Sequence, residues 1–261
     1  MTRYQKTVFT SLLVFLPAGI AVAIWFQVAR ASSSLLVAGV IVICVVAFAI
    51  NQAVLVVPLR RRFATAVERQ DADALDAILD ETMAMWPSNA KMRVFVDANR
   101  AVALMFRERW DEAVVQARST LARPNARTHE ALLLNNLAWA LAHAGALEEA
   151  ATVGQRALAA ATSEQVRASA NGTLGAVYAL RSDGDRALEY LDAADAINRG
   201  DAAIQATRQY YRGVAFRLKG RNADAIRAFE AASAAAPTSP FGRRSSSVLA
   251  NLAAFPHRRP G

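Results

Sequence analysis

The chain has 261 residues, 30 basic and 22 acidic side chains, and a formal net charge of +8. Its hydrophobic fraction is 54%, above the roughly 45–50% of ordinary globular domains. The charge is unevenly placed, because residues 1–62 carry six basic residues and no acid, whereas residues 63–236 are close to neutral. This distribution argues against nucleic acid as a partner of the central region, and the single Cys44 excludes an internal disulfide.

The first elements predicted are two uncharged apolar stretches, at about residues 7–29 and 34–57. Each reaches the roughly 20 residues that a membrane-spanning helix requires. Residues 1–59 are therefore predicted to form a two-helix transmembrane hairpin, with membrane lipid as a contact. An alternative reads the first stretch as a cleaved signal peptide.

Basic residues flank the predicted hairpin on its outer sides, at Arg3, Lys6 and Arg60 to Arg62, with Arg30 alone in the turn. The positive-inside rule then places both termini and the remaining chain in the cytoplasm. The expected location is the inner (plasma) membrane, with two spans. The Ala- and Arg-rich, Lys-poor composition is typical of a GC-rich bacterial genome.

Residues 60–237 contain an internal repeat. Alanines mark equivalent places in four segments, and the intervals between them are 37, 37 and 38 residues. A fixed period of this length predicts stacked helical hairpins. The small side chains allow two helices to approach closely where they cross. The four alanines are Ala113, Ala150, Ala187 and Ala225.

The repeat resembles the tetratricopeptide (TPR) family. The segment from Ala206 has Gly213, Phe216, Gly220, Ala225, Phe229, Ala232 and Pro237 at the family's spacing, and that from Ala168 has Leu174, Gly175, Tyr178, Ala187 and Ala194. The first of the four departs most, with Arg100 and Thr120 in place of a leucine and an alanine. The predicted fold is all-α, an α-solenoid of about four to five TPR-like hairpins. Residues 238–261 are predicted to form a basic tail with a short capping helix at 244–254.

The resemblance implies a concave groove that binds other proteins, as an extended peptide or a helix. Family spacing places the following residues in it: Phe95, Asn99, Asn135, Asn136, Trp139, His143, Tyr210 and Arg217, with Val102, Met105 and Thr173 beside them. Packing of Trp139 against a neighbouring helix is an equal alternative to its exposure as a binding residue. The basic residues of a carboxylate clamp are not matched.

We expect no catalytic residue and no cofactor. We also expect no metal site, because no two of the three histidines have ligand spacing on one helix. The predicted function is a membrane-anchored protein–protein interaction scaffold or adaptor that is not an enzyme. Two alternatives remain open: an accessory or regulatory subunit of an integral-membrane enzyme or transporter, and a scaffold that self-assembles as a homo-oligomer.

Overall fold

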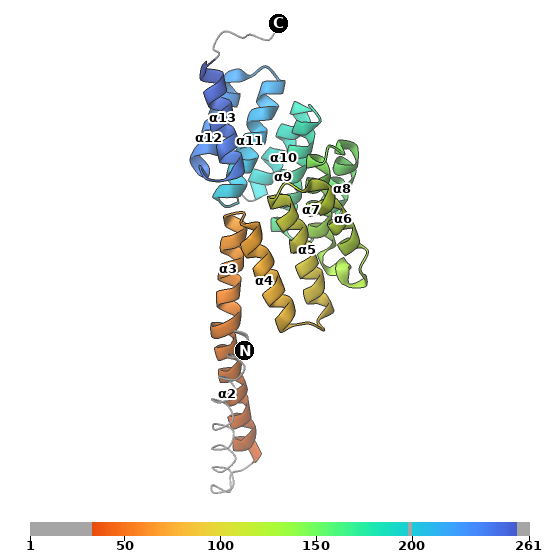
Figure 1. Cartoon of the computed structure of the whole chain (residues 1–261), viewed down its shortest axis with the longest axis vertical. Helices are drawn as coiled ribbons and strands as arrows, with labels where there is room; N and C mark the ends of the chain where they lie inside the picture. The colour runs from red at the N-terminus through yellow and green to blue at the C-terminus, as the bar shows by residue number, and fades with distance from the viewer. Residues whose placement is uncertain (1–32, 198–199, 255–261) are drawn as a thin grey trace. The chain divides into compact units, whose positions relative to one another are not determined.

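The computed structural model describes residues 33–197 and 200–254 of the chain, and these are helical with short connecting turns (Figure 1). They fall into two compact units, Met1–Thr65 and Ala66–Gly261. Each unit is described by itself. The domain boundary that the sequence predicts, between residues 59 and 60, stays a prediction.

The first unit contains α2 (Ser33–Asn51), the π-helical turn η1 (Gln52–Val56) and most of α3 (Val57–Glu68). Several apolar side chains of α2 are exposed, among them Val42, Val45 and Phe48. Cys44 on the same helix is a free, exposed thiol. The stretch predicted as a second span is thus divided among three helical elements.

The predicted membrane topology is wrong for the part of the chain that the structure describes. No helix in these ranges has both the length and the hydropathy that a bilayer crossing requires. A crossing needs about 20 apolar residues in one helix, whereas the α-helical run of α2 ends at Asn51 and a π-helical turn follows it. The first predicted span, residues 7–29, lies outside the described residues. The predicted inner-membrane location and its orientation are withdrawn with this finding.

The second unit is a series of antiparallel helical hairpins (Figure 1). Its helices are α4 (Ala72–Met85), α5 (Ala90–Phe106), α6 (Trp110–Leu121), α7 (Glu130–His143), α8 (Leu147–Ala159), α9 (Glu164–Leu180), α10 (Gly184–Ile197), α11 (Ala202–Leu218), α12 (Asn222–Ala235) and α13 (Pro240–Ala254). A 3-10 helix, η2 (Pro124–His129), precedes α7. Each helix packs on the next, and the odd-numbered helices α5, α7, α9, α11 and α13 also contact one another in order.

The same turn recurs at five places along the chain. A residue with positive φ, between 51° and 87°, ends the first helix of each pair, at Gln70, Glu108, Gly145, Ser182 and Gly220. The next residue donates its N–H to the carbonyl five residues back at 2.9–3.0 Å, as in Asp183 to Tyr178. This bond satisfies a helix-end carbonyl that would otherwise lack a partner. The repeat seen in the sequence is therefore a repeat of backbone geometry.

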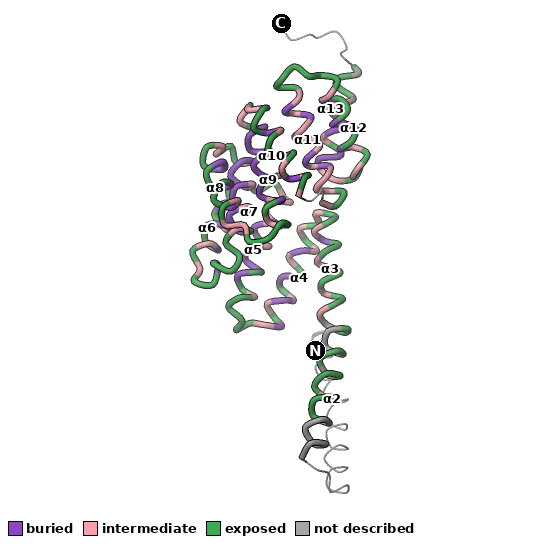
Figure 2. Tube along the Cα trace, turned by 180° about the vertical axis from the view of Figure 1, so that it is seen from behind, coloured by how far each residue is buried: buried purple, intermediate pink, exposed green. Residues whose placement is uncertain are grey.

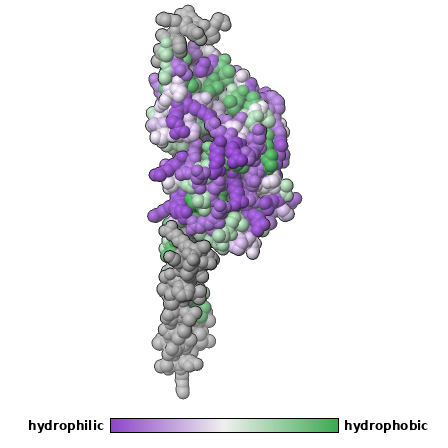
Figure 3. All heavy atoms as spheres, in the orientation of Figure 1, coloured by the Kyte–Doolittle hydropathy of each residue, from purple (hydrophilic) through white to green (hydrophobic). Residues whose placement is uncertain are grey.

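The alanines that defined the period lie where the two helices of a hairpin meet. Ala113, Ala150, Ala187 and Ala225 are at most 1% exposed. Buried residues gather on the facing sides of the helices, and the outer sides are exposed (Figure 2). On the face in Figure 3 the repeat unit is largely hydrophilic, with smaller hydrophobic areas. The all-helical repeat predicted from the sequence is confirmed for the described residues.

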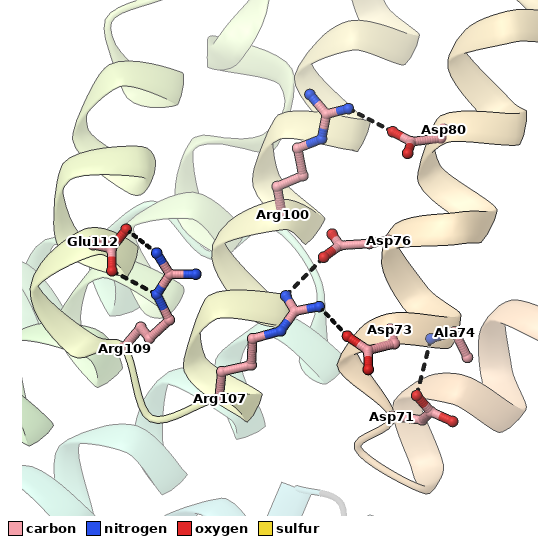
Figure 4. A network of polar contacts seen from close by, with 9 residues as sticks. All are labelled: Asp71, Asp73, Ala74, Asp76, Asp80, Arg100, Arg107, Arg109 and Glu112. Atoms are coloured by element: carbon pink, nitrogen blue, oxygen red, sulfur yellow. Dashed lines mark hydrogen bonds and ion pairs between the residues drawn. The ribbon is translucent and has the colours of Figure 1, made fainter.

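Charged side chains join α4 to α5 (Figure 4). The Arg107 guanidinium donates to Asp73 at 2.6 Å and to Asp76 at 2.7 Å. Nearer the start of α5, Arg100 pairs with Asp80 of α4 at 2.8 Å. The hydrogen bonds that Arg107 donates to the carboxylates of Asp73 and Asp76 raise the pKa of its guanidinium above the usual value, so its charge is fixed at every accessible pH.

Candidate functional site

A cavity of about 280 Å³ lies among the odd-numbered helices of the second unit. Side chains from α5, α7, α9 and α13 line it, together with Glu108 of the α5–α6 turn and Trp110 at the start of α6. The helices α5, α7 and α9, which are the first helices of three successive hairpins and contact one another in order, supply most of this lining. We call this cavity, with its lining residues, the groove.

Aromatic rings surround His143 within the groove. The indole of Trp110 stacks on the imidazole with ring centroids 4.5 Å apart and planes inclined by 20°. Trp139, one turn earlier on α7, lies 4.7 Å from the same ring. The hydroxyl of Tyr211 is 3.2 Å from His143 Nε2. The ring is therefore held on three sides by groups that do not carry a charge.

This environment favours the neutral imidazole. Burial, with the Arg244 guanidinium as a second cause, lowers the pKa of His143 to about 4. Burial raises the pKa of Tyr211 well above its usual value. At pH 7 both groups are neutral, and Nε2 can accept a hydrogen bond from the tyrosine hydroxyl.

Two neighbouring asparagines of α7 bring amide groups to the groove. Asn135 and Asn136 both line the cavity. The Asn135 Oδ1 atom is buried and has no hydrogen-bond partner among the described residues. A buried acceptor without a partner costs free energy unless a donor reaches it, so this atom is suited to accept an N–H from an occupant.

The structure brings together half of the residues predicted to line the groove. Asn135, Asn136, Trp139 and His143 line it, as do Val102, Met105 and Thr173. Trp139 is only partly exposed, and its ring contacts Tyr211 of α11 and Phe241 of α13.

The other predicted residues lie elsewhere. Phe95 and Asn99 are nearer the start of α5, where the Asn99 side chain donates to the Phe95 carbonyl at 2.8 Å. Tyr210 contacts Phe241 rather than the cavity itself. Arg217 is exposed in the last turn of α11. None of these four residues lines the cavity.

Sequence reasoning missed several residues that shape the site. Trp110 and Tyr211 contact His143, and Glu108, Phe241 and Arg244 line the cavity. Trp110 fits the repeat pattern, but family spacing did not place it in the groove. The signal that was available for α13 is Ser239-Pro240, a cap residue followed by proline at the first helical position.

A second, larger cavity of about 580 Å³ borders α10 and α11. Arg208 and Arg212 both pair with Asp195 there, at 2.9 and 2.8 Å, and Arg212 also pairs with Asp192. Arg208 is buried and donates to the Ala168 carbonyl of α9 as well. The two cations are balanced by two carboxylates, so the arrangement serves to join α9, α10 and α11.

Comparison with known proteins returns no matching family model and no matching curated protein. Among solved structures, the chain is similar to the crystal structure of MamA protein, at 20% identity and a TM-score of 0.42 over 69% of this chain and 90% of that one. It is also similar to a tetratricopeptide repeat protein from Parabacteroides merdae ATCC 43184, at 15% identity and a TM-score of 0.43 over 78% and 80%. Taken by themselves, the described residues form an all-helical repeat of stacked hairpins, with recurring turns and with alanines buried where the helices of a hairpin meet.

Proposed function

We propose that the chain is a protein–protein interaction scaffold, not an enzyme, and that its groove binds an extended segment of another protein. The observation that carries the proposal is the buried, unpartnered Oδ1 of Asn135 beside Asn136 and Trp139. Asparagine amides donate and accept hydrogen bonds as a peptide backbone does. Aromatic walls add contact area at a low entropic cost.

The charge of the groove supports an uncharged or weakly charged occupant at its centre. Its described lining has one acidic side chain, Glu108, and one guanidinium, Arg244, and these pair with each other at 2.7 Å. His143 is neutral at pH 7 because of its lowered pKa. A backbone with an apolar or aromatic side chain fits this environment better than an anion does.

Site-specific photocrosslinking of the full-length chain in cells tests the proposal. A photoreactive phenylalanine analogue replaces Asn136 in the groove, or Val115, which is 67% exposed on α6. We expect a partner to be crosslinked from position 136 and not from position 115. Combining the probe at 136 with Asn135→Ala should reduce the crosslinked product by about tenfold, because a buried hydrogen bond is lost.

Asn99→Ala is the matched control, since Asn99 bonds within its own helix and lies outside the groove. It should leave the crosslink unchanged. Crosslinking from position 115 alone, or a product unaffected by Asn135→Ala, would contradict the proposal. A product that proves to be a second copy of the chain would replace it with self-assembly.

A further inference from the structure

The first turn of α13 reaches into the groove. Ser239 begins it as the cap residue, its Oγ accepting the Gly242 N–H at 3.1 Å. Pro240 occupies the first helical position, where the missing N–H has no cost. The turn is therefore well defined in its own right, and its side chains Phe241 and Arg244 line the groove.

Phe241 is inserted among aromatic rings of two other helices. Its ring centroid is 5.9 Å from Trp139 on α7, 5.3 Å from Tyr210 and 5.4 Å from Tyr211 on α11. It is 7% exposed. A helix that only covers the last hairpin needs to contact α11 and α12, so the contact with α7 goes beyond capping.

Arg244 extends further along the groove. Its guanidinium pairs with Glu108 at 2.7 Å, across 136 residues of sequence, and lies 5.2 Å from the Phe241 ring. Glu108 holds a left-handed backbone conformation, with φ 56°, at a turn position where two of the other repeats have glycine. A glutamate at such a place costs backbone strain, and here its carboxylate meets the one guanidinium of the described groove lining.

In this arrangement, called the closure below, Phe241 and Arg244 occupy part of the wall of the cavity. Phe241 and Arg244 line that cavity together with Asn135, Asn136 and His143. Without Arg244, Glu108 would present an unpaired carboxylate beside aromatic surface, a setting that attracts a cation. Without Phe241, the rings of Trp139, Tyr210 and Tyr211 would form an exposed apolar surface that can bind another aromatic ring.

We propose that the first turn of α13 is an internal occupant of the groove, and that a protein partner displaces it with a segment carrying an aromatic and a basic side chain about one turn apart. The inference rests on the proposed function, and it adds both the chemistry of the partner and the regulation of access. The partner's aromatic ring contacts the rings that Phe241 contacts in the free chain, and its cation pairs with Glu108 in place of Arg244.

Hydrogen exchange of the full-length chain tests the closure without any partner. Arg244→Glu and Glu108→Arg each replace an attraction with a repulsion, and the double variant restores the pair with its charges exchanged. Both side chains are at least 40% exposed, so the fold should survive. We expect amide exchange in the first turn of α13 to be about five- to tenfold faster in each single variant, and close to the unmodified rate in the double variant. Unchanged exchange in both single variants would overturn the closure.

A synthetic peptide with the sequence of residues 237–247, PTSPFGRRSSS, tests the partner's chemistry. The peptide is added to the full-length chain with Phe241→Ala and Arg244→Glu, a host variant that lacks both of these groove-lining side chains. Circular dichroism checks that the variant is folded. We expect the peptide to bind this host at least about tenfold more tightly than the unmodified chain. A control peptide has alanine for the phenylalanine and glutamate for the second arginine.

Equal binding of the two peptides, or no binding of either, would overturn the assigned chemistry. The two tests separate the inference from the proposed function. Faster exchange combined with no crosslinked partner at position 136 would fail the function alone, whereas a crosslinked partner with unchanged exchange would fail the closure alone.

Discussion

His143 shows how a titratable residue is made neutral by its neighbours. Trp110 and Trp139 exclude water from its ring, and Tyr211 faces Nε2. Because the charged form is disfavoured, the pKa of His143 falls to about 4 in the folded chain, compared with roughly 6.5 in an unfolded one.

The sign of the pH dependence follows from this difference. Between pH 7 and 4 the unfolded chain takes up a proton at His143 that the folded chain does not, so the free energy of unfolding should fall by about 2–3 kcal/mol as pH is lowered. His143→Gln should lack this part of the decrease. Urea unfolding at pH 7, 5.5 and 4.5 measures it, and His129→Gln, at an exposed position, serves as the control. Parallel profiles for His143→Gln and the unmodified chain would contradict the assignment.

Ala150 is the single residue that tests the close packing of α7 on α8. It is fully buried where α7 meets α8. Ala150→Leu should lower the free energy of unfolding by about 1–3 kcal/mol, because overpacking forces neighbouring side chains out of their preferred rotamers. Ala159→Leu, exposed in the last turn of α8, should change it little. Chemical denaturation that gives equal values for the two variants would count against the crossing.

The five recurring turns belong to the scale of the element. Gly145 and Gly220 adopt positive φ without strain, whereas Gln70, Glu108 and Ser182 have a Cβ atom in the same conformation. Period and helix propensity were sufficient to predict where these turns fall. They did not predict the left-handed residue where glycine is absent, because the bond to the carbonyl five residues back is strong enough to impose it.

Ser182→Gly should raise the free energy of unfolding by about 0.5–1 kcal/mol, since relief of left-handed strain exceeds the added entropy of the unfolded chain. Gly145→Ser is the matched reverse change, because a Cβ atom there would meet nothing within 4 Å. It should destabilise the chain by a similar amount through backbone strain alone. Thermal melting of the two variants gives the comparison, and shifts in the same direction would refute the strain argument.

At the scale of the whole molecule, the sequence predicts the hairpins better than the groove between them. Of the residues that family spacing places in the groove, Asn135, Asn136, Trp139 and His143 line the cavity. Phe95 and Asn99 do not line it, since α5 borders the cavity only at its C-terminal end. The pairing of Arg244 with Glu108 joins positions 136 residues apart, and no periodicity within a repeat can indicate such a contact.

The long-range contacts of α13 also change how the repeat array should unfold. In an ordinary solenoid each hairpin touches only its neighbours, so the end units fray first and the rest can persist. Here α13 contacts α7 through Phe241 and the α5–α6 turn through Arg244. Fraying of the terminal hairpin would break contacts in the middle of the array at the same moment. The last helix therefore links local openings into a larger cooperative unit, in a fold whose sequence repeats would by themselves allow piecemeal melting.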